Sequence, residues 1–181
     1  ALGFNGKFRF QDVLNIEGSG SISLSATGAS VTLSGSLITP IMSFAVSGEL
    51  GLSWKSGESG LYGSLQLGLS MGASSIPNVA LSGTYQLEVN GTAITRQIRQ
   101  LDINPTTGAV QGLVEAEMAP ATIRIRASGM LRLAAFEMTG VYSFSLSSTG
   151  LTTDVSASVK LGPLGTGKAS GSLRIDSQGV L

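Results

Sequence analysis

The chain lacks cysteine and histidine altogether, and it has few charged residues. The absence of cysteine excludes a disulfide framework, a thiolate metal site and a cysteine nucleophile, and the absence of histidine excludes a Ser-His-Asp triad. Charged residues make up 12% of the 181 residues, and Lys plus Arg and Asp plus Glu both number 11. A chain without net charge lacks the basic surface of a nucleic-acid-binding protein, so we expect no nucleic-acid partner.

Long apolar runs are also missing, which excludes a transmembrane helix. The 42% of residues that are apolar are spaced regularly, so we expect a folded rather than a disordered chain. The sequence starts at Ala1 and closes with the turn-like DSQG followed by VL, which reads as the start of a further strand. We therefore expect a processed chain or a piece of a longer protein.

Alternation of apolar and small polar residues runs through nearly the whole sequence, as in VTLSGSL at 31–37. Turn-forming pairs and clusters of Gly, Pro, Asn and Ser interrupt this pattern at regular intervals. Such a pattern predicts an all-β chain, a meander of about twelve long antiparallel amphipathic strands.

Glycine recurs in the middle of the apolar side of these strands. Hairpin turns placed around Leu14, at Thr27-Gly28 and at later positions predict two cross-strand rows of small residues. The first row is Gly6, Gly20, Gly35, Gly48 and Gly63, and the second is Gly112, Gly129, Gly140, Ala157 and Gly171. A row of glycines lets every strand bend at the same place. We therefore expect the sheet to fold along a glycine crease into a sandwich-like or solenoid-like rod.

A tight turn at Pro120 predicts that two ion pairs form across neighbouring strands. It sets Glu117 opposite Arg124 and Glu115 opposite Arg126, on the polar face. Residues 79–103 fit the pattern less well, and the phase changes near Gln100. We expect one elongated β domain, 1–181, with sub-blocks 1–75 and 105–181 joined by 76–104.

Three polar motifs have both a chemical and a structural interpretation. DINPTTG, 102–108, has oxygen ligands in a calcium-like spacing but only one carboxylate, and it is ordinary turn chemistry. NGT, 90–92, matches an N-glycosylation acceptor and also a hairpin turn. GPLGTGK, 162–168, lacks the spacing of a phosphate-binding loop. We interpret the first two as turns and the third as a loop.

The remaining charged residues form no catalytic arrangement. The stripe of Arg124, Arg126 and Arg132 is explained in part by cross-strand pairing, and the dispersed carboxylates are Glu49, Glu58 and Glu88. No two of these make an acid–base pair. Trp54, which precedes a turn, is expected to plug the open end of the fold. We thus expect no catalytic, cofactor-binding or metal residue, no cofactor and no enzymatic activity.

The stretch FEMTGVYSFSLSSTGLTTDVSASVKLGPLGTGKASGSLRIDSQGV resembles the glycine- and serine-rich β-repeat segments of giant, adhesin-like bacterial cell-surface proteins. The resemblance spans most of the chain. It implies a structural or adhesive repeat module of an extracellular or cell-surface protein or filament. The partners it implies are neighbouring copies or further modules of the same chain, joined through open sheet edges.

Two alternatives remain. In the first, a folded sheet with an apolar interior is similar to the β-groove lipid-transfer proteins, whose trough holds acyl chains. Bulky residues expected to point inward argue against this alternative, because they would fill the interior themselves. They are Phe8, Phe10, Phe44, Tyr85, Phe136, Tyr142 and Phe144. In the second, the strand length suits an outer-membrane β-barrel. The chain has only one Trp and three Tyr, however, which are too few for the two aromatic girdles of such a barrel. Lipid and glycan both remain open as ligands, glycan because the outer face is rich in Ser and Thr.

Overall fold

The structure is a computed structural model of the chain. It describes residues 1–10, 14–39, 43–69, 79–104, 107–133, 136–147, 150–160, 166–176 and 179–180. All regular secondary structure in these ranges is β-strand, which confirms the predicted all-β class. No helix long and apolar enough to cross a membrane occurs in them.

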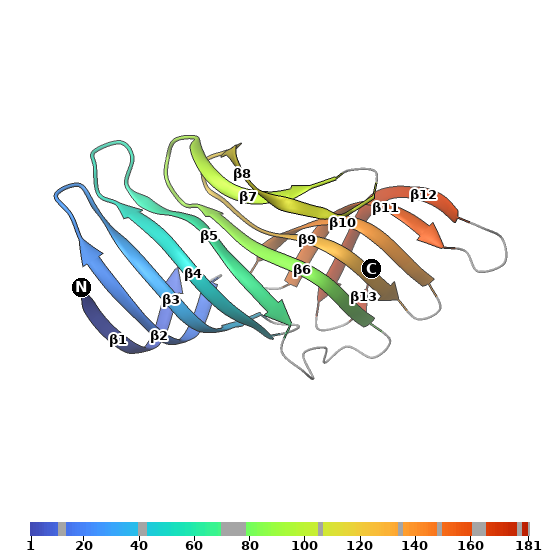
Figure 1. Ribbon diagram of the computed structural model, residues 1–181, viewed down its shortest axis with the longest axis horizontal. Helices are drawn as coiled ribbons and strands as arrows, with labels where there is room; N and C mark the ends of the chain where they lie inside the picture. Colours follow the sequence, from blue (N-terminus) through green and yellow to red (C-terminus); the bar gives the residue numbers. More distant parts are fainter. Residues whose placement is uncertain are drawn as a thin grey trace.

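One large antiparallel sheet contains most of the strands (Figure 1). Its 11 strands follow the order β1-β2-β3-β4-β5-β6-β9-β10-β11-β12-β13, and β7 and β8 form a separate pair. The strands are β1 (Leu2–Phe10), β2 (Leu14–Leu24), β3 (Gly28–Ile38), β4 (Ser43–Ser53), β5 (Gly60–Leu69), β6 (Val79–Asn90), β7 (Arg96–Ile103), β8 (Val110–Met118), β9 (Thr122–Leu133), β10 (Phe136–Ser147), β11 (Gly150–Lys160), β12 (Thr166–Asp176) and β13 (Gly179–Val180).

The hydrophobic core lies on one face of this sheet, here called the inner face. Alternate residues of each strand reach it, so that Leu33, Leu50, Leu65, Leu87 and Ile125 belong to one cluster. The strands of the large sheet are curved, and β1 and β2 bend back at the lower edge of the sheet in Figure 1. The inner face is therefore the concave side, and the opposite, outer face is polar.

Aromatic rings fill part of this concave side. Phe44 and Tyr85 pack with centroids 5.7 Å apart, and Tyr142 and Phe144 stack at 6.2 Å. All four side chains are buried. The predicted inward orientation of these four side chains is thus confirmed. Phe8 and Phe10 are half-buried against the same core, and the side chain of Phe136 lies outside the described residues.

The glycine row predicted for the first strands is wrong in its register. Gly18 pairs with Gly35, Gly20 faces Leu33, and Gly48 faces Leu65. The partner of Gly6 is also Gly18 rather than Gly20, and Gly35 and Gly63 face Val46 and Leu50. The predicted contacts of Gly20 with Gly35, Gly35 with Gly48 and Gly48 with Gly63 are thus not formed.

The error is a slip of two residues in each pairing. Ser25 donates its backbone N–H to the Gly28 carbonyl at 2.8 Å, so the β2–β3 turn is centred on Ala26 and Thr27, one residue before the predicted position. A slip of two residues leaves every side chain on the same face. Alternation alone therefore could not distinguish the two registers.

Small residues do line up farther along the sheet. Gly129 pairs with Gly140 and Gly140 with Ala157, as predicted, whereas Ala157 faces Ala169 and not Gly171. The row continues on the other side, because Gly83 of β6 faces Gly129. Gly83 has φ +142°, and a Cβ on it would overlap the Ser128 carbonyl oxygen and lie 2.8 Å from the Gly129 Cα. The backbones of β6 and β9 thus approach too closely for any side chain at this position.

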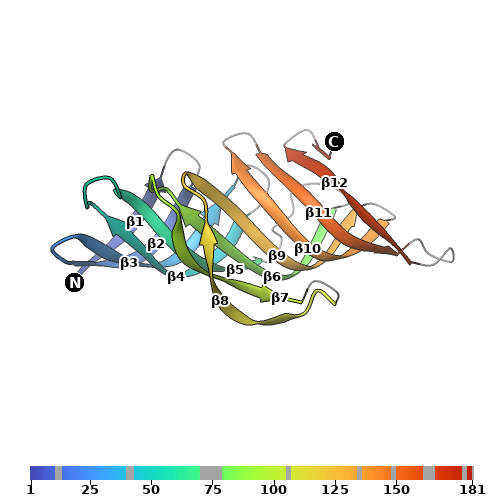
Figure 2. The same cartoon turned by 90° about the horizontal axis from the view of Figure 1, so that it is seen from above.

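The ion pairs predicted from the Pro120 turn are wrong, because β8 does not pair with β9. The chain does turn at Pro120, but β8 pairs with the preceding strand, β7. Strand β9 instead continues the large sheet and pairs with β6 along the whole length of both strands. Consequently Glu115 faces Arg99 rather than Arg126, and Glu117 faces Gln97 rather than Arg124. The chain is not a simple meander, and the β7–β8 hairpin lies on one side of the large sheet in Figure 2.

The large sheet is open at both ends. β1 pairs only with β2, along all nine of its residues. At the other end, β13 covers only Ile175 and Asp176 of β12, and no other described strand pairs with the outer side of β12. The described strands therefore leave two rows of unpaired backbone groups.

Candidate functional site

A cluster of polar side chains lies between the outer face of β6 and β9 and the β7–β8 hairpin that covers this face. We call this cluster the polar seam, and it consists of Gln86, Glu88, Gln100, Arg124 and Arg126. The Gln86 carboxamide accepts a hydrogen bond from the Leu101 backbone N–H at 2.8 Å. The Gln100 carboxamide oxygen accepts from Arg126 at 2.8 Å and from Arg124 at 3.2 Å. Polar contacts thus help to attach the hairpin here, alongside its buried apolar side chains Ile98, Leu101, Ile103 and Met118.

Glu88 and Arg124 form the only ion pair with a fully buried member among the described residues. Arg124 Nε lies 2.6 Å from Glu88 Oε2, and the Glu88 side chain has no exposed surface. Its other oxygen, Oε1, has no hydrogen-bond partner among the described residues. Burial raises the pKa of Glu88 above its ordinary value, an effect that outweighs the opposing influence of Arg124.

A second group of charged side chains, Lys55, Glu58 and Arg96, lies beside the start of β7. Glu58 accepts hydrogen bonds from Lys55 at 2.6 Å and from Arg96 at 3.2 Å, and the Lys55 contact is the main cause that lowers its pKa. The Arg96 guanidinium also lies 4.5 Å from the centroid of the Tyr62 ring. The same ring lies against Gly51, where a Cβ would be 2.5 Å from Tyr62 Cζ. Contacts with Arg96 and Gly51 thus hold Tyr62 in place.

Asn90 anchors the base of the hairpin, where β6 ends. Its buried amide donates to the carbonyls of Ile94 and Met118 at 2.9 Å and of Ala119 at 3.0 Å, and its oxygen accepts from the Thr92 hydroxyl at 2.7 Å. The NGT sequence therefore has a structural role, but it forms a bend and not the expected hairpin turn, because β6 and β7 do not pair with each other. The nitrogen that glycosylation would modify is buried and engaged in hydrogen bonds.

We expect Asn90→Ala to lower the free energy of unfolding by about 2 kcal/mol, because several buried polar groups lose their partners together. Chemical denaturation measures the change. The matched control is Asn5→Ala, at an exposed position of β1, for which we expect a change within about 0.5 kcal/mol. Equal stability of the two variants would contradict the anchoring role of Asn90.

The far end of the hairpin rests on β9 and β10. The Ser128 hydroxyl donates to the Gly108 carbonyl, and a Cβ on Gly108 would lie 3.7 Å from the Gly140 Cα. The DINPTTG turn is confirmed by hydrogen bonds from the Gly108 backbone to the Asn104 carbonyl at 2.8 Å and from the Thr107 backbone to Asn104 Oδ1 at 3.0 Å. Among the described residues, no three Asp or Glu side chains gather where they could hold a metal ion.

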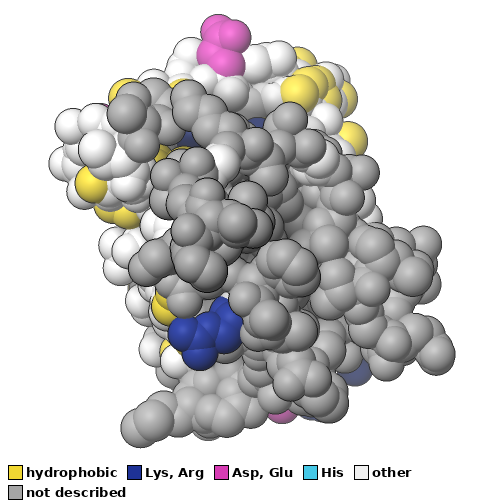
Figure 3. Space-filling model, turned by 90° about the vertical axis from the view of Figure 1, so that its right-hand side faces the viewer, with side chains coloured by type: hydrophobic (Ala, Val, Ile, Leu, Met, Phe, Trp, Pro, Cys, Tyr) yellow, Lys and Arg dark blue, Asp and Glu magenta, His cyan; other side chains and the backbone are white. Residues whose placement is uncertain are grey.

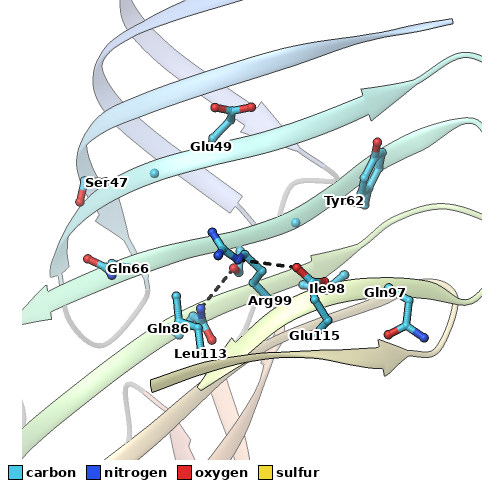
Figure 4. A pocket seen from close by; sticks show the side chains of 13 residues that line it. Ser47, Glu49, Tyr62, Gln66, Gln86, Gln97, Ile98, Arg99, Leu113 and Glu115 are labelled. Atoms are coloured by element: carbon cyan, nitrogen blue, oxygen red, sulfur yellow. Dashed lines mark hydrogen bonds and ion pairs between the residues drawn. The ribbon is translucent and has the colours of Figure 1, made fainter. Parts of the chain in front are cut away.

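A cleft of about 390 Å³ opens between the hairpin and the outer face of β4 and β5 (Figure 4). Its side chains come from both sides, and most are polar: Ser47, Glu49, Tyr62, Ser64, Gln66, Gln86, Gln97, Ile98, Arg99, Leu113 and Glu115. Arg99 and Glu115 pair across the hairpin at 3.6 Å. The Gln86 amide donates to Ser64 at 3.2 Å. The cleft thus presents several hydrogen-bonding groups.

The other residues singled out in the sequence do not meet at one site. Glu49 accepts a hydrogen bond from Ser30 at 2.6 Å on the outer face, and Ser64 of β5 lies between it and Glu88 in the same cross-strand row. Arg132 is exposed farther along β9 than Arg124 and Arg126. The GPLGTGK segment lies largely outside the described residues. The prediction that Trp54 plugs the open end of the fold is wrong: Trp54 is 46% exposed, and its indole N–H donates to the Ala26 carbonyl at 3.0 Å.

Gln86 and Gln100, which join the hairpin to the sheet, were not predicted from the sequence. One signal was present, because the change of phase near Gln100 coincides with two consecutive buried residues, Gln100 and Leu101. Comparison with known proteins adds no relative: no family model, no curated protein and no solved structure matches the chain.

Proposed function

We propose that the chain is a structural and adhesive module of an extracellular bacterial surface protein or filament. The observation that carries the proposal is the β1 edge, which offers its outer backbone groups for pairing along nine residues. An open edge of this kind pairs readily with another strand. The resemblance of the sequence to β-repeat segments of bacterial surface proteins supports the same role and the location outside the cell.

The partner in this proposal is a neighbouring copy or a further module of the same kind. The outer sides of β1 and β12 lie at opposite ends of the large sheet, so pairing between them would lengthen one antiparallel sheet without changing its faces. Lys7 on β1 is balanced by Glu17 of β2 at 2.6 Å, which reduces charge repulsion at this edge. Modules joined in this way would form a sandwich-like or solenoid-like rod.

A nearly uncharged surface suits lateral contact between such modules. Figure 3 shows only isolated charged side chains on the described part of one end of the molecule. With 12% charged residues, the chain has little electrostatic repulsion to oppose the approach of a second copy.

Hydrogen exchange read by mass spectrometry tests the proposal at low and high protein concentration. N–H groups of adjacent residues in a strand point to opposite edges, so about half of the β1 amides face outward. We expect those amides to gain protection at high concentration, together with a rise in molecular mass by light scattering. Peptides from β4, which is paired on both sides, are the internal control and should not change. A β1 strand that exchanges equally at both concentrations in a monomeric protein would refute the proposal.

A further inference from the structure

We propose that the cleft between the β7–β8 hairpin and the outer face of β4 and β5 binds an uncharged oligosaccharide. The proposal rests on the proposed function, because it names the ligand class of its adhesive part. It is carried by the lining of the cleft, which presents hydroxyl, carboxamide and carboxylate groups from the sheet on one side and from the hairpin on the other. Its volume lies at the lower end of the range of small-ligand sites.

Unused hydrogen-bonding capacity in the cleft indicates a polar ligand. The side chains of Ser47, Gln66 and Gln97 are exposed and make no hydrogen bond with another described residue. A carboxamide both donates and accepts, and so does a hydroxyl. Groups that combine both abilities match the hydroxyls of a sugar, each of which is a donor and an acceptor at once.

The charges in the cleft argue against the other ligand classes. Its carboxylates, Glu49 and Glu115, outnumber the single guanidinium of Arg99, which is itself paired with Glu115, so a phosphate or a nucleic acid would be repelled. Glu49 already accepts a hydrogen bond from Ser30, and the described residues hold no metal-binding group of carboxylates. Leu113 is the one large apolar side chain of the described lining that is exposed, so the cleft offers no continuous apolar wall for an acyl chain.

The position of the ligand follows from the two amides. Gln66 projects from β5, and Gln97 projects from β7 on the other side of the cleft (Figure 4). A saccharide that contacts both would lie along the gap between sheet and hairpin. Because the polar seam fixes the hairpin relative to the sheet, the two sets of groups are already in place before a ligand arrives.

The experiment is a titration of the whole chain with cellotetraose, maltotetraose and chitotetraose, followed by NMR of the glutamine side-chain amides. We expect at least one probe to shift the amides of Gln66 and Gln97 in a saturable manner, with Kd of about 1 mM or tighter. The amide of Gln111, which is exposed on β8 outside the cleft, should not move.

Variants then locate the site. Gln66→Ala and Gln97→Ala should each weaken binding about tenfold, equal to about 1.4 kcal/mol, while Gln111→Ala leaves affinity unchanged. All three positions are exposed, so thermal unfolding should be unaffected. The proposal is overturned if no probe at about 10 mM shifts Gln66 and Gln97, or if the two alanine variants bind as the wild type does. Either failure leaves the exchange behaviour of β1, and thus the proposed structural role, independently measurable.

Discussion

Gly83→Ala is expected to lower the free energy of unfolding by about 3 kcal/mol or more, or to prevent folding. The added Cβ would collide with the Ser128 carbonyl oxygen of β9, and the residue would have to keep φ at +142°. Backbone atoms cannot rotate away as the end of a flexible side chain can. Relief therefore requires β6 and β9 to separate where they hold the two parts of the sheet together.

Urea or thermal denaturation followed by circular dichroism measures this effect. Gly68→Ala on β5 is the matched control, because its Cβ would meet only the Ala45 Cβ, at 3.7 Å, and no unusual φ is required there. We expect this control to be neutral or more stable by up to about 1 kcal/mol, since alanine restricts the unfolded chain. If both variants unfold at the same denaturant concentration as the wild type, the close approach of β6 and β9 is refuted.

Arg124→Met is expected to cost about 3–5 kcal/mol at neutral pH, since it leaves the Glu88 carboxylate buried without its counter-ion. The loss should depend on pH. Burial already raises the folded-state pKa of Glu88 above 4.5, and removal of Arg124 raises it further. A raised folded pKa contributes stability that is complete below the unfolded value and disappears as pH rises through the folded value. The deficit of Arg124→Met should therefore shrink as pH falls from 8 toward 4.5.

Urea unfolding of the variant and of the wild type across this pH range tests the prediction. The double variant Glu88→Gln/Arg124→Met should regain part of the lost stability and should lose the added pH dependence. Arg99→Met removes an ion pair whose members are 71% and 60% exposed, and it should cost no more than about 1 kcal/mol. A constant deficit of Arg124→Met at every pH would show that Glu88 does not titrate as described.

Local patterns predicted which face of each strand is buried but not always which strand lies beside it. Alternation placed Leu33 and Leu50 correctly on the apolar face. It did not decide between Gly18 and Gly20 as the partner of Gly35, because both lie on the same face and a turn moved by one residue exchanges them. The pairing of Gly129 with Gly140 was predicted correctly because the short connection after Leu133 leaves little choice of register.

The candidate site depends on contacts that a local pattern does not contain. Arg124 was expected to pair with Glu117, its neighbour across the nearest turn, but it pairs with Glu88, which comes earlier in the chain. The expectation failed because the β7–β8 hairpin leaves the sheet and allows β6 to take the place beside β9. Gln86 and Gln100 gain their roles only from this rearrangement, so their residue types alone carried no signal.

The pairing of β6 with β9 across the intervening hairpin has a consequence for the order of folding. Neighbouring strands such as β9 and β10 are joined by short connections, so their contacts are local and form early. The β6–β9 pairing must wait until a longer loop closes, at an entropic cost that grows only slowly with loop length. Contacts formed first within the intervening β7–β8 hairpin shorten that loop, so the β6–β9 pairing is expected to follow the formation of the hairpin.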